Sequence, residues 1–146
     1  MTLYRRYPDL EGVLASLMTR EFGRLVADAA ARADGANTRE RVVAMVVHGS
    51  RALAEDPLFV RLLDVDPELL LPYVTQRLGG MQKMAVAASA RLLAEADDSV
   101  RDDAPPEVLA AGMELIARGF VLASHGELAV DPWAELARAI DGYLRP

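Results

Sequence analysis

The sequence contains no cysteine, so it can form neither a disulfide nor a thiolate metal site. Aromatic residues are also scarce, at 5% of the 146 residues, whereas 52% of the residues are hydrophobic. This apolar content argues against disorder, and the predominance of Leu, Ala and Val favours helices. A secreted, disulfide-stapled scaffold is therefore excluded, and a helical domain with a real core is expected.

Long apolar runs and leader-like segments are absent as well. No stretch of about 18 apolar residues occurs, so the sequence predicts no membrane-spanning helix and no membrane partner. The first residues include Tyr4, Arg5, Arg6 and Asp9, which does not resemble a signal peptide. We therefore expect a cytoplasmic protein. Its net charge of −6 repels nucleic acid overall.

Side chains suited to catalysis are few. The two histidines, His48 and His125, lie in no nucleophilic-triad or metal-spacing pattern. The Gly79-Gly80 pair lacks the Lys and Ser/Thr of a phosphate-binding loop. The acidic stretch 97–103 lacks the Gly and final Glu of a calcium loop, and we expect it to be a solvated loop. The sequence therefore predicts no enzyme, no metal site and no cofactor.

Helical spacing of apolar residues runs through most of the chain. The predicted helices span about 9–33, 37–54, 57–64, 66–71, 72–97, 106–125 and 132–144. Within the second of these, the β-branched run at 42–47 would also suit a strand, but a capping residue precedes it and helix formers follow it. We interpret it as a buried, central helix. Because no strand is predicted, the expected fold class is all-α, a helical bundle.

A short motif marks the start of the chain. Pro8 can end one helix, and Asp9 can cap the next. The motif consists of Thr2, Leu3, Tyr4, Tyr7, Pro8, Asp9, Glu11, Val13 and Leu14. It resembles the junction in TetR-family transcriptional regulators between the recognition helix of the helix-turn-helix and the first long helix of the regulatory domain. Leu10 departs from it, because the family usually has a phosphate-contacting Lys there.

The resemblance implies a division of the chain into two parts. Residues 1–8 would be a remnant of the recognition helix, in which Thr2, Tyr4 and Arg5 retain DNA contacts. Residues 9–146 would form the effector-binding and dimerisation domain, and the order of the predicted helices agrees with this. The remainder of the DNA-binding domain is absent from the sequence, so we expect operator DNA to be bound only by a full-length parent.

The resemblance also implies a pocket for a small-molecule effector among the helices. Any single one of the Met and Phe residues favours an interpretation as plain core, but together they are adaptable side chains spread over four helices, which suits the lining of a pocket. His48 is either a hydrogen-bonded core residue or a polar anchor for the ligand. The predicted pocket residues are Met18, Phe22, Met45, His48, Tyr73, Met81, Met84, Met113 and Phe120.

The last two helices are expected to form a homodimer interface. The helix at 106–125 carries one thin charged stripe of Glu107, Glu114 and Arg118, and it is otherwise too apolar for the surface of a monomer. In the family, the last two helices form the four-helix interface of the dimer. The predicted interface residues are Ala117, Val121, Leu136, Ile140 and Tyr143. The alternative interpretation is a stand-alone helical ligand-binding or protein-interaction module without a DNA-binding role.

Overall fold

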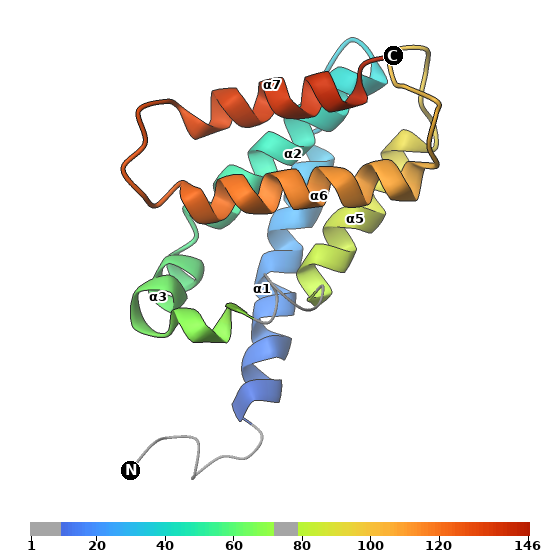
Figure 1. Cartoon of the computed structure of the whole chain (residues 1–146). Helices are drawn as coiled ribbons and strands as arrows, with labels where there is room; N and C mark the ends of the chain where they lie inside the picture. Colours follow the sequence, from blue (N-terminus) through green and yellow to red (C-terminus); the bar gives the residue numbers. More distant parts are fainter. Residues whose placement is uncertain (1–9, 72–78) are drawn as a thin grey trace, which may run out of the picture.

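The computed structural model describes residues 10–71 and 79–146, and every regular element in them is helical. The elements are α1 (Leu10–Ala31), α2 (Thr38–Ala54), α3 (Pro57–Val65), the 3-10 helix η2 (Pro67–Leu69), α5 (Gly80–Leu93), α6 (Pro106–Ala123) and α7 (Pro132–Leu144). The predicted all-α fold class is confirmed (Figure 1).

Capping side chains explain where three of the helices begin. Asn37 caps α2: its Oδ1 accepts a hydrogen bond from Glu40 N at 2.9 Å, while Glu40 Oε2 accepts one from Ala36 N at 2.9 Å. Asp56 and Asp131 cap α3 and α7, and a proline follows each of them at the first helical position. The predicted starts of these three helices are therefore confirmed.

The two adjacent glycines lie at a helix start rather than inside a helix. Gly79 is the N-cap of α5, which begins at Gly80 and ends at Leu93, so the prediction of one helix over 72–97 is wrong at both glycines. Residues 72–78 lie outside the described residues. A Cβ on Gly80 would stand 2.7 Å from Cγ2 of Thr19 on α1. The glycine therefore allows α1 and α5 to approach each other closely.

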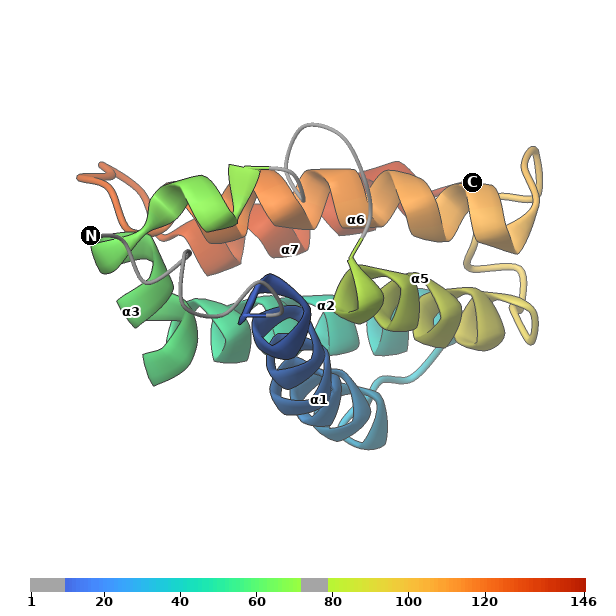
Figure 2. The ribbon, with the colours of Figure 1, turned by 90° about the horizontal axis from the view of Figure 1, so that it is seen from below.

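The helices pack in layers around α2. Seen from below, α6 and α7 form one layer, α2 and α5 form the next, and α1 crosses on the far side of that second layer (Figure 2). Helix α2 packs against α1, α5, α6 and α7, as its predicted central place requires. Helix α3 and η2 follow α2 at one end of the bundle (Figure 1).

The buried residues form two apolar clusters. The larger one joins α2, α5, α6 and α7, and its residues include Val42, Leu93, Val100, Leu109, Ala110, Met113, Leu136, Ile140 and Leu144. The smaller one joins α1, α2, α3 and the end of α6, and consists of Phe22, Ala54, Phe59, Leu70 and Val121. In it, the rings of Phe22 and Phe59 meet edge to face, with their centroids 6.1 Å apart.

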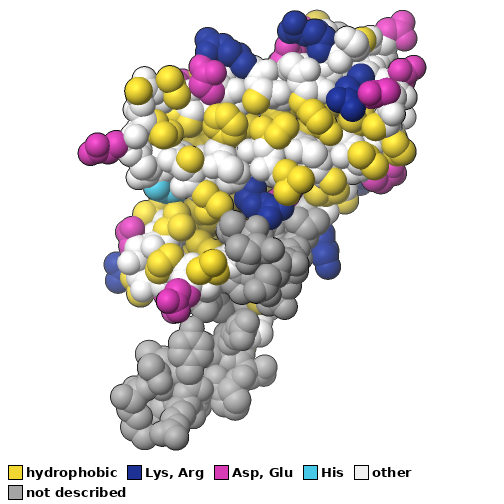
Figure 3. All heavy atoms as spheres, viewed as in Figure 1, with side chains coloured by type: hydrophobic (Ala, Val, Ile, Leu, Met, Phe, Trp, Pro, Cys, Tyr) yellow, Lys and Arg dark blue, Asp and Glu magenta, His cyan; other side chains and the backbone are white. Residues whose placement is uncertain are grey.

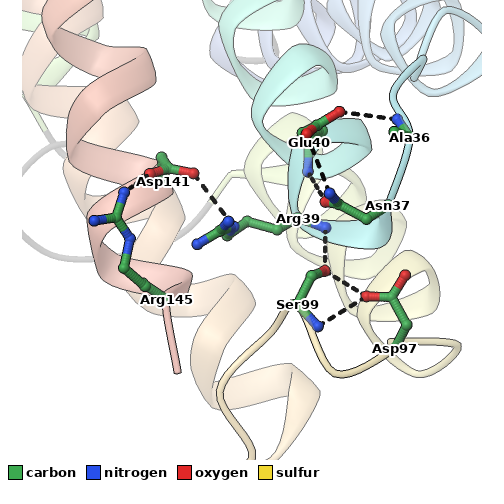
Figure 4. Close-up of polar contacts among 8 residues, drawn as sticks. All are labelled: Ala36, Asn37, Arg39, Glu40, Asp97, Ser99, Asp141 and Arg145. Atoms are coloured by element: carbon green, nitrogen blue, oxygen red, sulfur yellow. Dashed lines mark hydrogen bonds and ion pairs between the residues drawn. The ribbon is translucent and has the colours of Figure 1, made fainter.

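Hydrogen bonds and an ion pair connect the start of α2 to the loop before α6 and to α7 (Figure 4). Asp97 Oδ2 accepts a hydrogen bond from Thr38 N at 3.1 Å, and Ser99 Oγ accepts one from Arg39 N at 3.1 Å. Bonds from Ser99 and from the Thr38 backbone hold the pKa of Asp97 below its usual value. The Nε of Arg39 lies 3.3 Å from Oδ1 of Asp141. Asp97, which was expected in a solvated loop, thus accepts a hydrogen bond from the first backbone N–H of α2.

Candidate functional site

A cavity of about 210 Å³ lies among α1, α2, α3, α5 and α6. It exceeds the roughly 150 Å³ of an engineered apolar cavity that takes up benzene. Its walls are mostly apolar. Met18 and Phe22 line it from α1, Met45 from α2, Met81 from α5 and Met113 from α6. The structure therefore brings five of the predicted pocket residues around one space, and their contact with a ligand stays a prediction.

The other predicted pocket residues lie elsewhere. His48 stands on the surface between α2 and α1, with its Nε2 3.3 Å from Oδ2 of Asp28 and its side chain 40% exposed. Met84 is exposed, and Phe120 packs against the larger apolar cluster. Neither of these two residues nor His48 lines the cavity. Tyr73 lies outside the described residues. His48 is therefore neither the core residue nor the cavity anchor that the sequence suggested.

A charged pair that the sequence analysis did not predict forms part of the cavity wall. Glu114 and Arg118, one helical turn apart on α6, both line the cavity. Arg118 Nε donates to Glu114 Oε1 at 3.0 Å, and Arg118 Nη2 donates to Glu114 Oε2. Their side chains are only 10% and 18% exposed, respectively. The i, i+4 spacing predicts such a pair, but spacing alone does not tell whether the stripe faces inward.

Two of the predicted dimer residues on α7, Leu136 and Ile140, are buried within the chain. Leu136 and Ile140 have no exposed surface, because the apolar face of α7 is covered by α2 and α6. Their assignment to a dimer interface is therefore corrected. Val121 is buried and, together with Ala117, lines the cavity. Tyr143 packs into the α6–α7 contact, where a Cβ on Gly112 would stand 2.2 Å from its hydroxyl.

The outward side of α6 carries apolar residues that the sequence analysis did not select. Val108 is 56% exposed and Leu115, two turns further on, is 64% exposed. Ala111 and Gly119 are exposed in the same row. A band of hydrophobic side chains runs across the face formed by α6 and α7 (Figure 3). We call Val108, Ala111, Leu115 and Gly119 the outer row of α6.

Residues 10–71 and 79–146 contain neither a metal-binding cluster nor a membrane-spanning helix. No three His, Asp or Glu side chains in this part of the chain are grouped so that they could hold a metal ion. None of its helices combines the length and the apolar character needed to cross a bilayer.

Comparison with known proteins adds relatives over nearly the whole chain. No family model matches. An uncharacterised HTH-type transcriptional regulator of Mycobacterium bovis is 30% identical over 149 residues, which cover 98% of this chain and 76% of the relative. Two uncharacterised HTH-type transcriptional regulators of Mycobacterium tuberculosis, from strains CDC 1551 and H37Rv, show the same identity and coverage.

A solved structure shares the fold. The transcriptional repressor QsdR of R. erythropolis, from the TetR family, superposes with a TM-score of 0.77. The match covers 97% of this chain and 76% of that protein, at 17% sequence identity. The all-α bundle described here is thus the fold of a TetR-family repressor, and its sequence relatives are HTH-type transcriptional regulators. The chain therefore belongs to the HTH-type transcriptional regulators and shares the fold of a TetR-family repressor, in agreement with the resemblance of its N-terminal motif.

Proposed function

We propose that residues 9–146 are the effector-binding and dimerisation part of a TetR-type regulator, and that residues 1–8 are the end of its recognition helix. The observation that carries this proposal is the apolar cavity between α1 and helices α2, α5 and α6. Met18, Phe22, Met45, Met81 and Met113 surround it from four helices, so a ligand there would contact α1 and the body of the bundle together. The effector we propose is a small, mostly apolar molecule, bound without any catalytic step.

The position of α1 would transmit binding to the DNA-reading part. An effector changes an equilibrium only if it binds two arrangements with different affinity. Met18 and Phe22 belong to α1, so a ligand against them favours one placement of that helix. Helix α1 packs closely against α5, so that a Cβ on Gly23 of α1 would stand 2.7 Å from Cε of Met84 on α5. Because of this close packing, a small change in the cavity would alter the position of α1. Such a shift of α1 would then alter the spacing of two DNA-binding heads in a dimer.

The dimer we propose forms through the outer row of α6. Val108 and Leu115 are large apolar side chains left exposed by the packing of a single chain. Ala111 and Gly119 leave room for a helix of a second copy to lie against the row, and a Cβ on Gly119 would meet nothing within 4 Å. Light scattering should give twice the chain mass of 15.8 kDa. A mass of 15.8 kDa at micromolar concentration would exclude this interface.

Binding to operator DNA is proposed for a full-length regulator in the cytoplasm, not for this sequence alone. Duplex affinity comes mainly from neutralised phosphates, and this sequence has a net charge of −6. Its candidate contacts, Thr2, Tyr4 and Arg5, lie outside the described residues. Anisotropy with a labelled palindromic duplex should show no saturable binding below about 10⁻⁴ M. An in-frame helix-turn-helix encoded upstream of Met1 would favour this assignment over that of a stand-alone ligand-binding module.

A thermal-shift screen of uncharged apolar compounds tests the cavity. A compound present at about 100 times its Kd should raise the free energy of unfolding by about 2.7 kcal/mol. Ala85 lines the cavity from α5, whereas Ala87 of the same helix is exposed. Ala85→Phe should abolish the stabilisation by filling the space, and Ala87→Phe should preserve it. Equal responses of the two variants, or no response to any compound in the wild type, would contradict the proposal.

A further inference from the structure

Two buried hydroxyl groups interrupt the apolar wall of the cavity. Ser50 on α2 and Ser89 on α5 both line it, and only 8% and 6% of their surface is exposed. Helices α2 and α5 lie in one layer between α1 and α6 (Figure 2). The two hydroxyls therefore belong to the middle layer of the bundle, away from the outer surface.

Neither hydroxyl is bound within the chain. A serine in a helix often donates its hydroxyl to a backbone carbonyl about one turn earlier. Ser124, just after α6, does so, because its Oγ donates to the carbonyl of Val121 at 2.8 Å. In residues 10–71 and 79–146, the hydroxyls of Ser50 and Ser89 make neither this bond nor any other. Both are therefore polar groups whose hydrogen-bonding capacity is unused.

The two serine oxygens also remain open to the cavity. Among the side chains that the structure describes, Arg39 Nε is the one N or O atom that is fully enclosed and has no hydrogen bond. The oxygens of Ser50 and Ser89 have no hydrogen bond either, so they must keep some accessible surface. Both residues are buried from the outside and line the cavity, so this surface faces the cavity.

Unused hydroxyls in a cavity favour one class of occupant. A hydroxyl has one donor and two acceptor positions, and losing its water without gaining a partner is unfavourable. A pure hydrocarbon in the cavity would impose that loss on Ser50 and Ser89. A ligand with an oxygen group of its own would replace the lost bonds.

We propose that Ser50 and Ser89 are the polar subsite of the cavity, and that the effector is a mostly apolar molecule with an uncharged hydroxyl or carbonyl group that bonds to them. This inference rests on the proposed function, because it assigns a ligand class to the cavity proposed there. The oxygen group lies toward α2 and α5, and the apolar remainder lies among the methionines.

Three probes built on the same ring test the subsite: cyclohexanol, cyclohexanone and methylcyclohexane. They are similar in size, and they differ in whether the ring carries a hydroxyl, a carbonyl or a methyl group. The ¹³C-methyl signals of Met18, Met45, Met81 and Met113, which line the cavity, should shift with saturation and give a Kd for each probe.

Removing both hydroxyls should affect the probes in opposite directions. In Ser50→Ala/Ser89→Ala, the Kd of cyclohexanol and of cyclohexanone should rise at least about fivefold, the effect of one neutral hydrogen bond. The Kd of methylcyclohexane should stay the same or fall, because it no longer leaves a hydroxyl without a partner. Ser16→Ala, the same change at an exposed residue of α1 outside the cavity lining, should leave all three values unchanged.

A measurement on the wild type decides the question even if the double variant does not fold. In bound cyclohexanol, the proton on the carbon that carries the hydroxyl should show nuclear Overhauser effects to the Cβ protons of Ser50 or Ser89. Contacts of that proton to methionine methyl groups alone would place the hydroxyl elsewhere and overturn the inference.

The outcomes separate this inference from the proposed function on which it rests. If none of the three probes shifts the methionine signals, the effector cavity itself fails, and the inference fails with it. If the probes bind but the double variant weakens all three alike, or none of them, only the role of Ser50 and Ser89 is overturned. Helix content by circular dichroism verifies the folding of each variant.

Discussion

The two apolar clusters of the bundle differ in how completely they are packed. Around α7, Leu136, Ile140 and Leu144 have no exposed surface. Around α1 and α3, Phe22 and Phe59 are also buried, yet they border the cavity of about 210 Å³. A cavity leaves its lining without partners for dispersion contacts. The α7 side is therefore packed without a gap, whereas the α1 side contains the space that we propose an effector fills.

The largest expected effect lies on the fully packed side. Ile140→Ala should lower the free energy of unfolding by about 2–5 kcal/mol, because Ile140 is completely buried and the deletion leaves a new void. Urea denaturation measures this. Leu128→Ala, at a residue 45% exposed, is the matched control and should change the free energy by less than about 0.5 kcal/mol. Similar losses in both variants would remove the distinction between core and surface.

The contact between α1 and α5 should be the next most sensitive. Gly80→Ala should destabilise the fold by about 1–3 kcal/mol, because its Cβ would stand 2.7 Å from Cγ2 of Thr19. Gly142→Ala, on the exposed side of α7, meets nothing within 4 Å and should instead stabilise α7 by up to about 1 kcal/mol. Thermal unfolding measures both variants. The interpretation fails if Gly80→Ala is stabilising to the same extent.

A smaller effect is expected at the outer row of α6, and it separates self-association from folding. Leu115→Glu should weaken the proposed dimer at least tenfold, about 1.4 kcal/mol, while the helix content stays unchanged. Leu128→Glu, in the loop before α7, carries the same change and should leave the dimer intact. Sedimentation equilibrium measures both variants. An unchanged dimer in Leu115→Glu would place the interface elsewhere.

The smallest effect concerns the exposed pair of His48 and Asp28. Hydrogen bonds from Arg32 and His48 hold the pKa of Asp28 below its usual value of 3.8. Stability from Asp28 is therefore present above its unfolded pKa and is lost as the pH falls through its lower folded pKa. Acid denaturation below about pH 4 should be slightly steeper for the wild type than for Asp28→Asn. Superimposable curves would mean that the contacts of Asp28 with Arg32 and His48 contribute nothing to stability.

Local sequence chemistry predicted the starts of α2, α3 and α7 and five of the residues that line the cavity. Asn37, Asp56 and Asp131 act as caps through their own side chains, so neighbouring residues suffice to recognise them. The methionines around the cavity were predictable because soft residues recur on several helices. The charge of Glu114 and Arg118 suggested solvent, and only the packing of α6 against α1 and α5 turns that stripe inward.

The α7 face shows where a sequence pattern stops being informative. Leu136 and Ile140 recur at helical spacing, and such a stripe looks the same whether it meets another part of the chain or a second copy. The structure turns it onto α2 and α6, which leaves Val108 and Leu115 of α6 exposed instead. Which apolar stripe remains on the surface depends on contacts between distant segments. The expectations for residues 1–8 stay predictions.

Xenon uptake tests the central claim, that a ligand-accessible apolar cavity lies beneath α1, most directly. Xenon enters empty apolar cavities and needs no polar partner. In ¹³C-methyl spectra under xenon pressure, Met18, Met45, Met81 and Met113 should shift with saturation, and by more than Met84, whose methyl lies beside Gly23 of α1 outside the cavity. Unchanged signals for those four methionines, or equal shifts for all of them and Met84, would contradict the account.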